Sequence, residues 1–221
     1  MGPDQTVCVF IQARMSSARF PGKVLAPLGG KPVIAHVIER VGEAVRPQQI
    51  VVATSDNASD DPLALYVRSL GIQVFRGPLE NVFLRFQLCL REHPCRWFFR
   101  VSADSPLLDA ALFGRMLEHR EREDIDLVTN IFPRTFPKGR SLEMIRAKTF
   151  AAIDPSPLSL KEQEHVTPVY YRHPERFNII NIASSDPGEE GTSLAVDTRE
   201  DLARLEALLQ SKSGMASKRR S

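Results

Sequence analysis

Short apolar runs recur along the first 130 residues, and segments with apolar residues at helical spacing lie between them. The runs occupy residues 7–11, 50–53, 72–75, 97–101 and 126–129. The first run is continuous and rich in β-branched residues, which is typical of a strand buried on both faces. Helical spacing is found at residues 34–45, 63–70, 83–90 and 112–117. This alternation predicts a doubly wound α/β domain with a mostly parallel central sheet.

The regular alternation ends near residue 130. Beyond it the pattern predicts a strand at 143–145, a short helix at 148–153, a polar helical segment at 156–173 and a strand at 178–183. We interpret residues 131–183 as a small insertion over the edge of the sheet. A buried strand at 192–196 and an amphipathic helix, which begins at a capping box of Thr198 and Asp201, then complete the domain.

Length and composition fit one domain. At 221 residues, with 43% hydrophobic and 25% charged residues, the chain can bury a sizeable core, which we place within residues 1–211. We expect the basic residues 212–221 to form a disordered tail. The net charge of +2 does not indicate nucleic-acid binding, and no apolar run reaches the length of a membrane span. Three cysteines without a CxxC pair argue against a disulfide framework and a structural zinc site, and favour a reducing cytoplasm.

Candidate chemistry begins directly after the first apolar run. Arg14, Arg19 and Lys23 lie close together among small and turn-forming residues, with no acid between them. In open α/β sheets, ligands bind at the carboxyl ends of the strands. Small residues let backbone N–H groups approach phosphate oxygens, and fixed cations neutralise those oxygens. The loop therefore predicts a polyphosphate site; the alternative is a row of ordinary surface cations.

Two aspartates follow later predicted strands. Asp104 comes after the run at 97–101, and Asp197 comes after the run at 192–196. Magnesium is bound by a few carboxylates together with phosphate oxygens and water, so this pattern predicts a magnesium site beside a polyphosphate. Alternatively, Asp104 is a turn residue and Asp197 is the N-cap of the last helix. The spacings of a P-loop, a GxGxxG motif and a GxSxG nucleophile elbow are absent.

Several segments together resemble a known family. They lie at residues 12–25, 51–56, 74–77, 100–109, 164–168 and 196–202, and so span nearly the whole chain in order. The first reads QARMSSARFPGKVL and is similar to the opening of cytidylyltransferases that activate acidic sugars, such as 3-deoxy-manno-octulosonate. The resemblance is greater to the branch of spore coat polysaccharide biosynthesis protein F.

The resemblance implies a three-layer nucleotidyltransferase fold like that of GT-A glycosyltransferases. It implies that the chain is an enzyme with CTP as its donor, a small anionic acceptor, a magnesium ion on Asp104 and Asp197, and a homodimer formed through residues 131–183. Catalysis would depend on Arg14 and Lys23, which would hold the triphosphate, and on Asp104. Further positions near the nucleotide would be Ala13, Arg19, Thr54, Ser55, Asp56 and Arg85. The acceptor side would include Glu143, Glu164 and His165.

The sequence departs from the family pattern in two places. Ala103 and Ser105 flank Asp104 where the family commonly has glycine and cysteine. Lys138, Arg140 and Ser141 stand near positions where the family tends to have acids, which favours a more anionic acceptor, such as a phosphonate or a phosphorylated acid. Two other functions remain open: a GT-A-like glycosyltransferase that uses a nucleotide sugar, and a catalytically silent nucleotide-binding partner.

Overall fold

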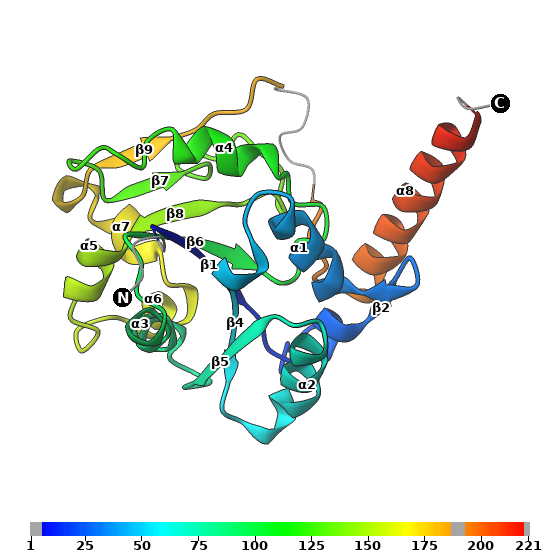
Figure 1. The fold of residues 1–221 in the computed structure, drawn as a ribbon, viewed down its shortest axis with the longest axis horizontal. Coiled ribbons are helices and arrows are strands. Elements are labelled where there is room, and N and C mark those ends of the chain that lie inside the picture. The colour runs from blue at the N-terminus through cyan, green and yellow to red at the C-terminus, as the bar shows by residue number, and fades with distance from the viewer. Residues whose placement is uncertain (1–5, 187–192, 219–221) are drawn as a thin grey trace.

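One seven-stranded sheet organises the protein. The computed structural model describes residues 6–186 and 193–218, the last seven of these as backbone only. The strands follow the order β5-β4-β1-β6-β8-β7-β9 across the sheet, and all run in the same direction except β8, which is antiparallel to both neighbours (Figure 1). Their bounds are β1 Val7–Gln12, β4 Ile50–Ser55, β5 Gln73–Gly77, β6 Trp97–Ser102, β7 Leu127–Thr129, β8 Glu143–Arg146 and β9 Ile179–Asn181. A separate hairpin pairs β2 Pro27–Leu28 with β3 Lys31–Pro32.

Helices cover both faces of the sheet, which confirms the predicted three-layer α/β fold. Alternate residues of β1 belong to different cores: Val9 lies in one apolar cluster and Phe10 in the other. The first cluster contains residues of α1, α2 and α4, and the second contains residues of α3, α5 and α7. The helices are α1 Val33–Gly42, α2 Asp61–Ser69, α3 Val82–Glu92, α4 Ala111–Leu117, α5 Ala147–Ala152, α6 Leu160–His165, α7 Pro168–Arg172 and α8 Arg199–Lys218.

Residues 131–183 do not lie over the edge of the sheet as we expected. They contribute β8, which lies between β6 and β7, and β9, which forms the edge. The reason lies in β8 itself: Met144 packs into the first cluster and Ile145 into the second, so this short strand is buried on both faces. A segment with that pattern belongs inside the sheet.

The end of the chain also differs from the expectation. Of the strand expected at 192–196, Thr192 lies outside the described residues, and Ser193 forms only a single bridge with Lys138. Leu194 and Val196 pack instead on α8 in a third apolar cluster. The capping box at Thr198 and Asp201 is confirmed, but α8 continues as helical backbone to Lys218, into the segment expected to be a disordered tail (Figure 1).

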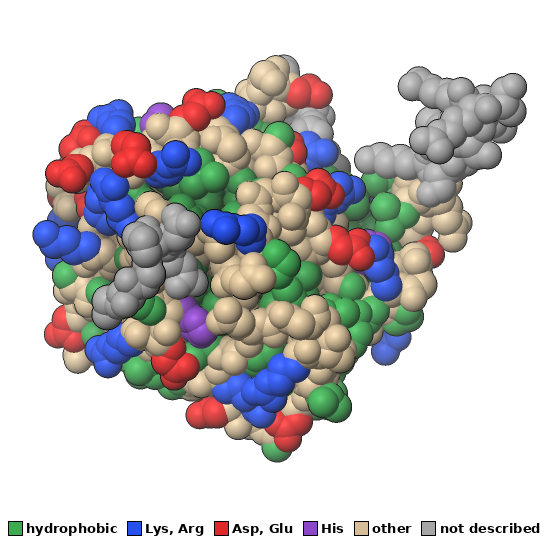
Figure 2. Space-filling view, viewed as in Figure 1, with side chains coloured by type: hydrophobic (Ala, Val, Ile, Leu, Met, Phe, Trp, Pro, Cys, Tyr) green, Lys and Arg blue, Asp and Glu red, His purple; other side chains and the backbone are tan. Residues whose placement is uncertain are grey.

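Among the described residues, no helix combines the length and apolar character that crossing a bilayer requires. On the face shown in Figure 2, acidic and basic side chains are interspersed, as the small net charge leads one to expect.

Candidate active site

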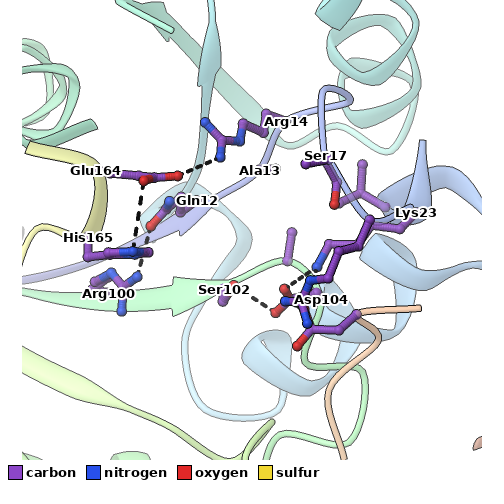
Figure 3. Close-up of a pocket in the computed structure, with 15 residues that line it drawn as sticks. Gln12, Ala13, Arg14, Ser17, Lys23, Arg100, Ser102, Asp104, Glu164 and His165 are labelled. Atoms are coloured by element: carbon purple, nitrogen blue, oxygen red, sulfur yellow. Dashed lines mark hydrogen bonds and ion pairs between the residues drawn. The ribbon is translucent and has the colours of Figure 1, made fainter. Parts of the chain in front are cut away.

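A polar cavity of about 330 Å³ opens at the carboxyl ends of β1 and β6 (Figure 3). This is the end of a parallel sheet where ligands bind in open α/β folds. Its walls come from the loop after β1, the turn after β6, the end of α6 and the segment before α8. The lining residues are Gln12, Ala13, Arg14, Ser17, Ala18, Arg19, Lys23, Val24, Arg100, Ser102, Ala103, Asp104, Glu164, His165 and Asp197.

The loop after β1 is held in a fixed course by its own backbone. The N–H groups of Ser17 and Gly22 both donate to the carbonyl of Met15, at 2.9 and 2.8 Å. Gly22 has a φ of 75°, a left-handed conformation that glycine adopts without strain. A short 3₁₀ turn at Lys23–Leu25 follows, with Val24 buried. The backbone that carries the Lys23 side chain is therefore well anchored.

Lys23 lies between the two aspartates that the sequence predicted to converge. Its Nζ is 2.6 Å from Asp104 Oδ2 and 3.2 Å from Asp197 Oδ1. Arg19 Nη2 is 2.9 Å from the same Asp197 oxygen, and Ser102 Oγ donates to Asp104 Oδ1 at 2.8 Å. A backbone hydrogen bond from Val196 N, in the residue before Asp197, to Asp104 O also joins the two segments that carry the acids.

Two carboxylates that share one cation form a donor set suited to a divalent ion. Both Asp104 and Asp197 are within bonding distance of the Lys23 ammonium, which shows that a positive charge is accommodated between them. Magnesium takes a few carboxylates and completes its shell with phosphate oxygens and water, so the residues present fit it. Within the described residues, no cluster of three or more His, Cys, Asp or Glu side chains could hold a metal ion.

A second group of charged residues forms the other end of the cavity. Arg14 Nη2 is 2.9 Å from Glu164 Oε1, and His165 Nε2 is 3.9 Å from Glu164 Oε2. Burial lowers the pKa of His165 and, with smaller contributions from cations such as Arg100, outweighs the opposing charge of Glu164, which favours the neutral imidazole at pH 7. Arg14 is thus paired with Glu164, which lies 150 positions away in the sequence. The sequence of the loop did not indicate this partner.

Glu143 reaches this end of the cavity only through Arg100. Glu143 is almost fully buried and does not line the cavity, but its Oε2 accepts a hydrogen bond from Arg100 Nη1 at 2.8 Å. Arg100 Nη2 in turn donates to Gln12 Oε1 at 2.9 Å. Arg100, Gln12 and Ser102 are site residues that the sequence reasoning missed. The available signal was a lone arginine within the otherwise apolar run at 97–101.

Thr54, Ser55, Asp56 and Arg85 are not among the residues that line the cavity, and their expected position near the nucleotide stays a prediction. The hydroxyl groups of the buried Thr54 and Ser55 both donate to Asp60 Oδ2, at 2.9 and 2.5 Å. Asp56 is exposed and is held by its backbone N–H, which donates to Gly77 O.

Arg85 lies on α3 and is fully buried. Its Nη1 donates to the carbonyls of Pro78 and Leu79, whereas Nε and Nη2 have no hydrogen-bond partner among the described residues. Burial, together with the charge of Arg14, lowers the pKa of Arg85 to about 10. It remains a cation at neutral pH, close enough to Arg14 for the two charges to interact.

Comparison with known proteins gives consistent matches. The model of a family described as cytidylyltransferase matches residues 8–219. The spore coat polysaccharide biosynthesis protein SpsF of Bacillus subtilis is 31% identical over 214 residues, which cover 92% of this chain and 86% of that protein. The 3-deoxy-manno-octulosonate cytidylyltransferase of Geobacter sulfurreducens is 44% identical over 113 residues, which cover 50% of this chain and 44% of that enzyme.

The fold is also found among solved structures. A cytidylyltransferase from Leptospira borgpetersenii superposes with a TM-score of 0.84 at 24% sequence identity, and the match covers 95% of this chain and 96% of that one. At this level of identity the likeness establishes only that the two chains share their fold.

Proposed function

The chain belongs to the cytidylyltransferase family, which makes it a nucleotidyltransferase that uses CTP, and from this premise we propose that it transfers CMP to a small anionic acceptor and releases pyrophosphate. The observation that carries the proposal is the convergence of Lys23, Arg19 and two aspartates at one end of the cavity. In the proposed reaction, an acceptor oxygen attacks the α-phosphorus of CTP. The bond between the α- and β-phosphates breaks, and pyrophosphate leaves with the bonding electrons.

The proposal gives the cations and the two aspartates separate tasks. Lys23 and Arg19 bind the phosphates and compensate the charge that builds on the leaving pyrophosphate. Asp104 and Asp197 would hold a magnesium ion, which would supply further charge neutralisation at the phosphate oxygens. The protein contributes position and electrostatics, because phosphoryl transfer needs little covalent participation by side chains.

The proposed acceptor carries an acidic group, such as a carboxylate or a phosphonate. The wall away from Lys23 contains the guanidinium groups of Arg14 and Arg100 beside the neutral imidazole of His165. The relatives support a role in polysaccharide or glycoconjugate biosynthesis, since one is described as a spore coat polysaccharide biosynthesis protein. The three free cysteines, Cys8, Cys89 and Cys95, support a cytoplasmic location, and a homodimer formed through residues 131–183 is part of the proposal.

Pyrophosphate release tests the proposal directly. The protein is incubated with magnesium, each of the four nucleoside triphosphates and a panel of acidic sugars and phosphonates, with neutral sugars as controls. We expect release only from CTP and only with an anionic acceptor. Asp104→Ala should lower the turnover by more than about a hundredfold while circular dichroism stays unchanged, the scale typical of a lost electrostatic stabiliser.

The same assay separates the alternatives. A glycosyltransferase would release a nucleotide from a nucleotide sugar and no pyrophosphate from CTP. A silent partner would bind CTP and release nothing with any acceptor. Near-normal turnover by folded Asp104→Ala would refute the role proposed for the two aspartates.

A further inference from the structure

Arg100 occupies an unusual place, because it is a charged residue that directly follows the three apolar residues with which β6 begins. It lies on β6 directly opposite Glu143 on β8, so the ion pair between them crosses adjacent strands. Glu143 is 1% exposed, and its second oxygen, Oε1, accepts a hydrogen bond from the Tyr171 hydroxyl at 2.5 Å. Glu143 is therefore held from two sides and fixes the plane of the Arg100 guanidinium.

The guanidinium keeps donors that no described residue uses. An arginine has five N–H donors. One N–H of Nη1 is directed to Glu143 and one N–H of Nη2 to Gln12, and Nε is shielded from solvent without a hydrogen-bond partner among the described residues. The second N–H of Nη1 and that of Nη2 have no acceptor among the described residues and are the donors left for a ligand. Arg100 also lines the cavity. A rigid, partly unsatisfied guanidinium in a cavity wall matches the geometry of a carboxylate or a phosphonate, which can accept two parallel hydrogen bonds.

Arg100 lies apart from the residues that would hold the triphosphate. Figure 3 shows it with Gln12, His165, Glu164 and Arg14 at one end of the cavity, while Lys23 and Asp104 lie at the other. The two ends thus offer separate places for two anions. The end that contains Asp104 and Asp197 suits a polyphosphate with its metal, which leaves the Arg100 end for the second substrate.

We propose that Arg100 is the receptor for the anionic group of the acceptor, and that buried Glu143 is a positioning residue that aims it. The proposal rests on the proposed function, since it assigns a role within the same reaction. It also explains how Glu143 contributes to acceptor binding without reaching the cavity. The competing explanation is structural: the ion pair would only join β6 to β8.

Kinetics with Arg100→Lys distinguish the two explanations. Lysine keeps the charge but loses the planar fork, so we expect the KM for the acceptor to rise at least about tenfold while the KM for CTP changes less than about twofold. The acceptor probes are 3-deoxy-manno-octulosonate for a carboxylate and 2-hydroxyethylphosphonate for a phosphonate. Glu143→Gln should raise the same KM and leave the KM for CTP unchanged.

The chain provides a matched control at the other end of the same strand pair. Arg146 on β8 lies opposite Trp97 on β6, and its guanidinium stacks 4.4 Å from the centre of the indole ring. Arg146 is not in the cavity wall. Arg146→Lys should therefore lower the melting temperature without changing either KM. An equal change in acceptor KM for both lysine variants would overturn the proposal.

A binding measurement keeps this proposal separate from the activity. In protein labelled with ¹⁵N-arginine, the Nε–H resonance of Arg100 is assigned by its loss in Arg100→Lys. We expect that resonance to shift saturably with one of the two probe anions at millimolar concentration and not with glucose. The probe that shifts it identifies the acidic group, even if no pyrophosphate is released. A shift caused by CTP alone, or no shift with either anion, overturns the proposal.

Discussion

At the residue scale, Asp60 shapes the site without belonging to it. It is fully buried, and its carboxylate accepts hydrogen bonds from Met15 N at 2.7 Å, from Thr54 Oγ1 at 2.9 Å and from both the N and Oγ of Ser55. The bond to Met15 fixes the loop that carries Arg14, Arg19 and Lys23. This role of Asp60 could not be read from the sequence, because Met15 becomes its neighbour only when β1 and β4 pair.

We predict that Asp60→Asn destabilises the protein by about 2–3 kcal/mol at pH 7, because an amide replaces a charged acceptor and faces buried donors. Burial raises the pKa of Asp60, but the hydrogen bonds from Ser55, Met15 and Thr54 outweigh it, so the folded-state pKa lies below the usual value. The contribution of the Asp60 charge to the free energy of unfolding is therefore fully present above the unfolded-state pKa of about 4. It is lost as the pH falls through the folded-state pKa.

Urea unfolding from pH 7 down to pH 3 checks both parts of this prediction. The difference in unfolding free energy between wild type and Asp60→Asn should be largest at pH 7 and shrink below about pH 4. Asp124→Asn, which removes an exposed acid far from the loop, is the control. A difference that stays constant with pH would contradict the assignment of the effect to the Asp60 charge.

At the scale of elements, the sequence predicted where strands and helices lie along the chain better than which other elements they lie beside. The apolar runs at 7–11, 50–53 and 97–101 became β1, β4 and β6, each extended by one or two polar residues. The position of β8 could not be read from the sequence, because periodicity shows that a segment is buried on both faces but not which strands flank it. Leu194 and Val196 were misassigned for a similar reason: a buried apolar alternation also suits a segment packed beneath a helix.

The start of α8 is an element that positions a site residue. Asp201 Oδ2 accepts hydrogen bonds from Asp197 N at 3.1 Å and from Thr198 N at 3.0 Å, so the cap that begins the helix also orients the segment with Asp197. Loss of such a cap costs about 1 kcal/mol. We predict that Asp201→Ala lowers both the melting temperature and the turnover with CTP, because Asp197 is no longer held beside Lys23.

A matched helix-start variant separates these two effects. Asp109 accepts from Ala111 N at 3.0 Å at the start of α4 and does not line the cavity. Asp109→Ala should lower the melting temperature to a similar extent and leave the turnover unchanged. If Asp109→Ala and Asp201→Ala reduce turnover equally, the loss reflects stability alone and the positioning role of the cap is wrong.

At the scale of the whole molecule, the sequence indicated which charged residues gather at the cavity but not how they pair. Lys23 and Asp104 converge as expected, because the carboxyl ends of the parallel strands β1 and β6 meet at one edge of the sheet. Asp197 joins them from the segment before α8 and not from the end of a strand. The contacts of Arg14 with Glu164 and of Arg100 with Glu143 could not be predicted, since they depend on where α6 and β8 dock. Arg14, Arg19 and Lys23, which have no acid among them in the sequence, are each paired with an acid in the structure.

This pairing of charges leads to a prediction about nucleotide binding. A triphosphate that approaches Lys23 must compete with Asp104 and Asp197, whose carboxylates repel it. Two unit charges about 4 Å apart interact with roughly 1 kcal/mol in bulk water and roughly 4 kcal/mol near a protein surface. Removing both acids should therefore change the affinity for CTP by a measurable amount. We predict that in EDTA the Asp104→Asn/Asp197→Asn variant binds CTP at least about tenfold more tightly than the wild type, and that added magnesium no longer strengthens binding.

Isothermal titration calorimetry of CTP with and without magnesium measures these affinities. The control is Asp124→Asn/Asp154→Asn, which removes two exposed acids outside the cavity and changes the net charge equally. It should bind CTP like the wild type and keep the response to magnesium, because exposed charges beyond about 10 Å are screened by salt. If removing the cavity acids instead weakens binding in EDTA, then Asp104 and Asp197 serve mainly to hold Lys23 and Arg19 in position for the phosphates. Their proposed role as metal ligands would then lose its electrostatic basis.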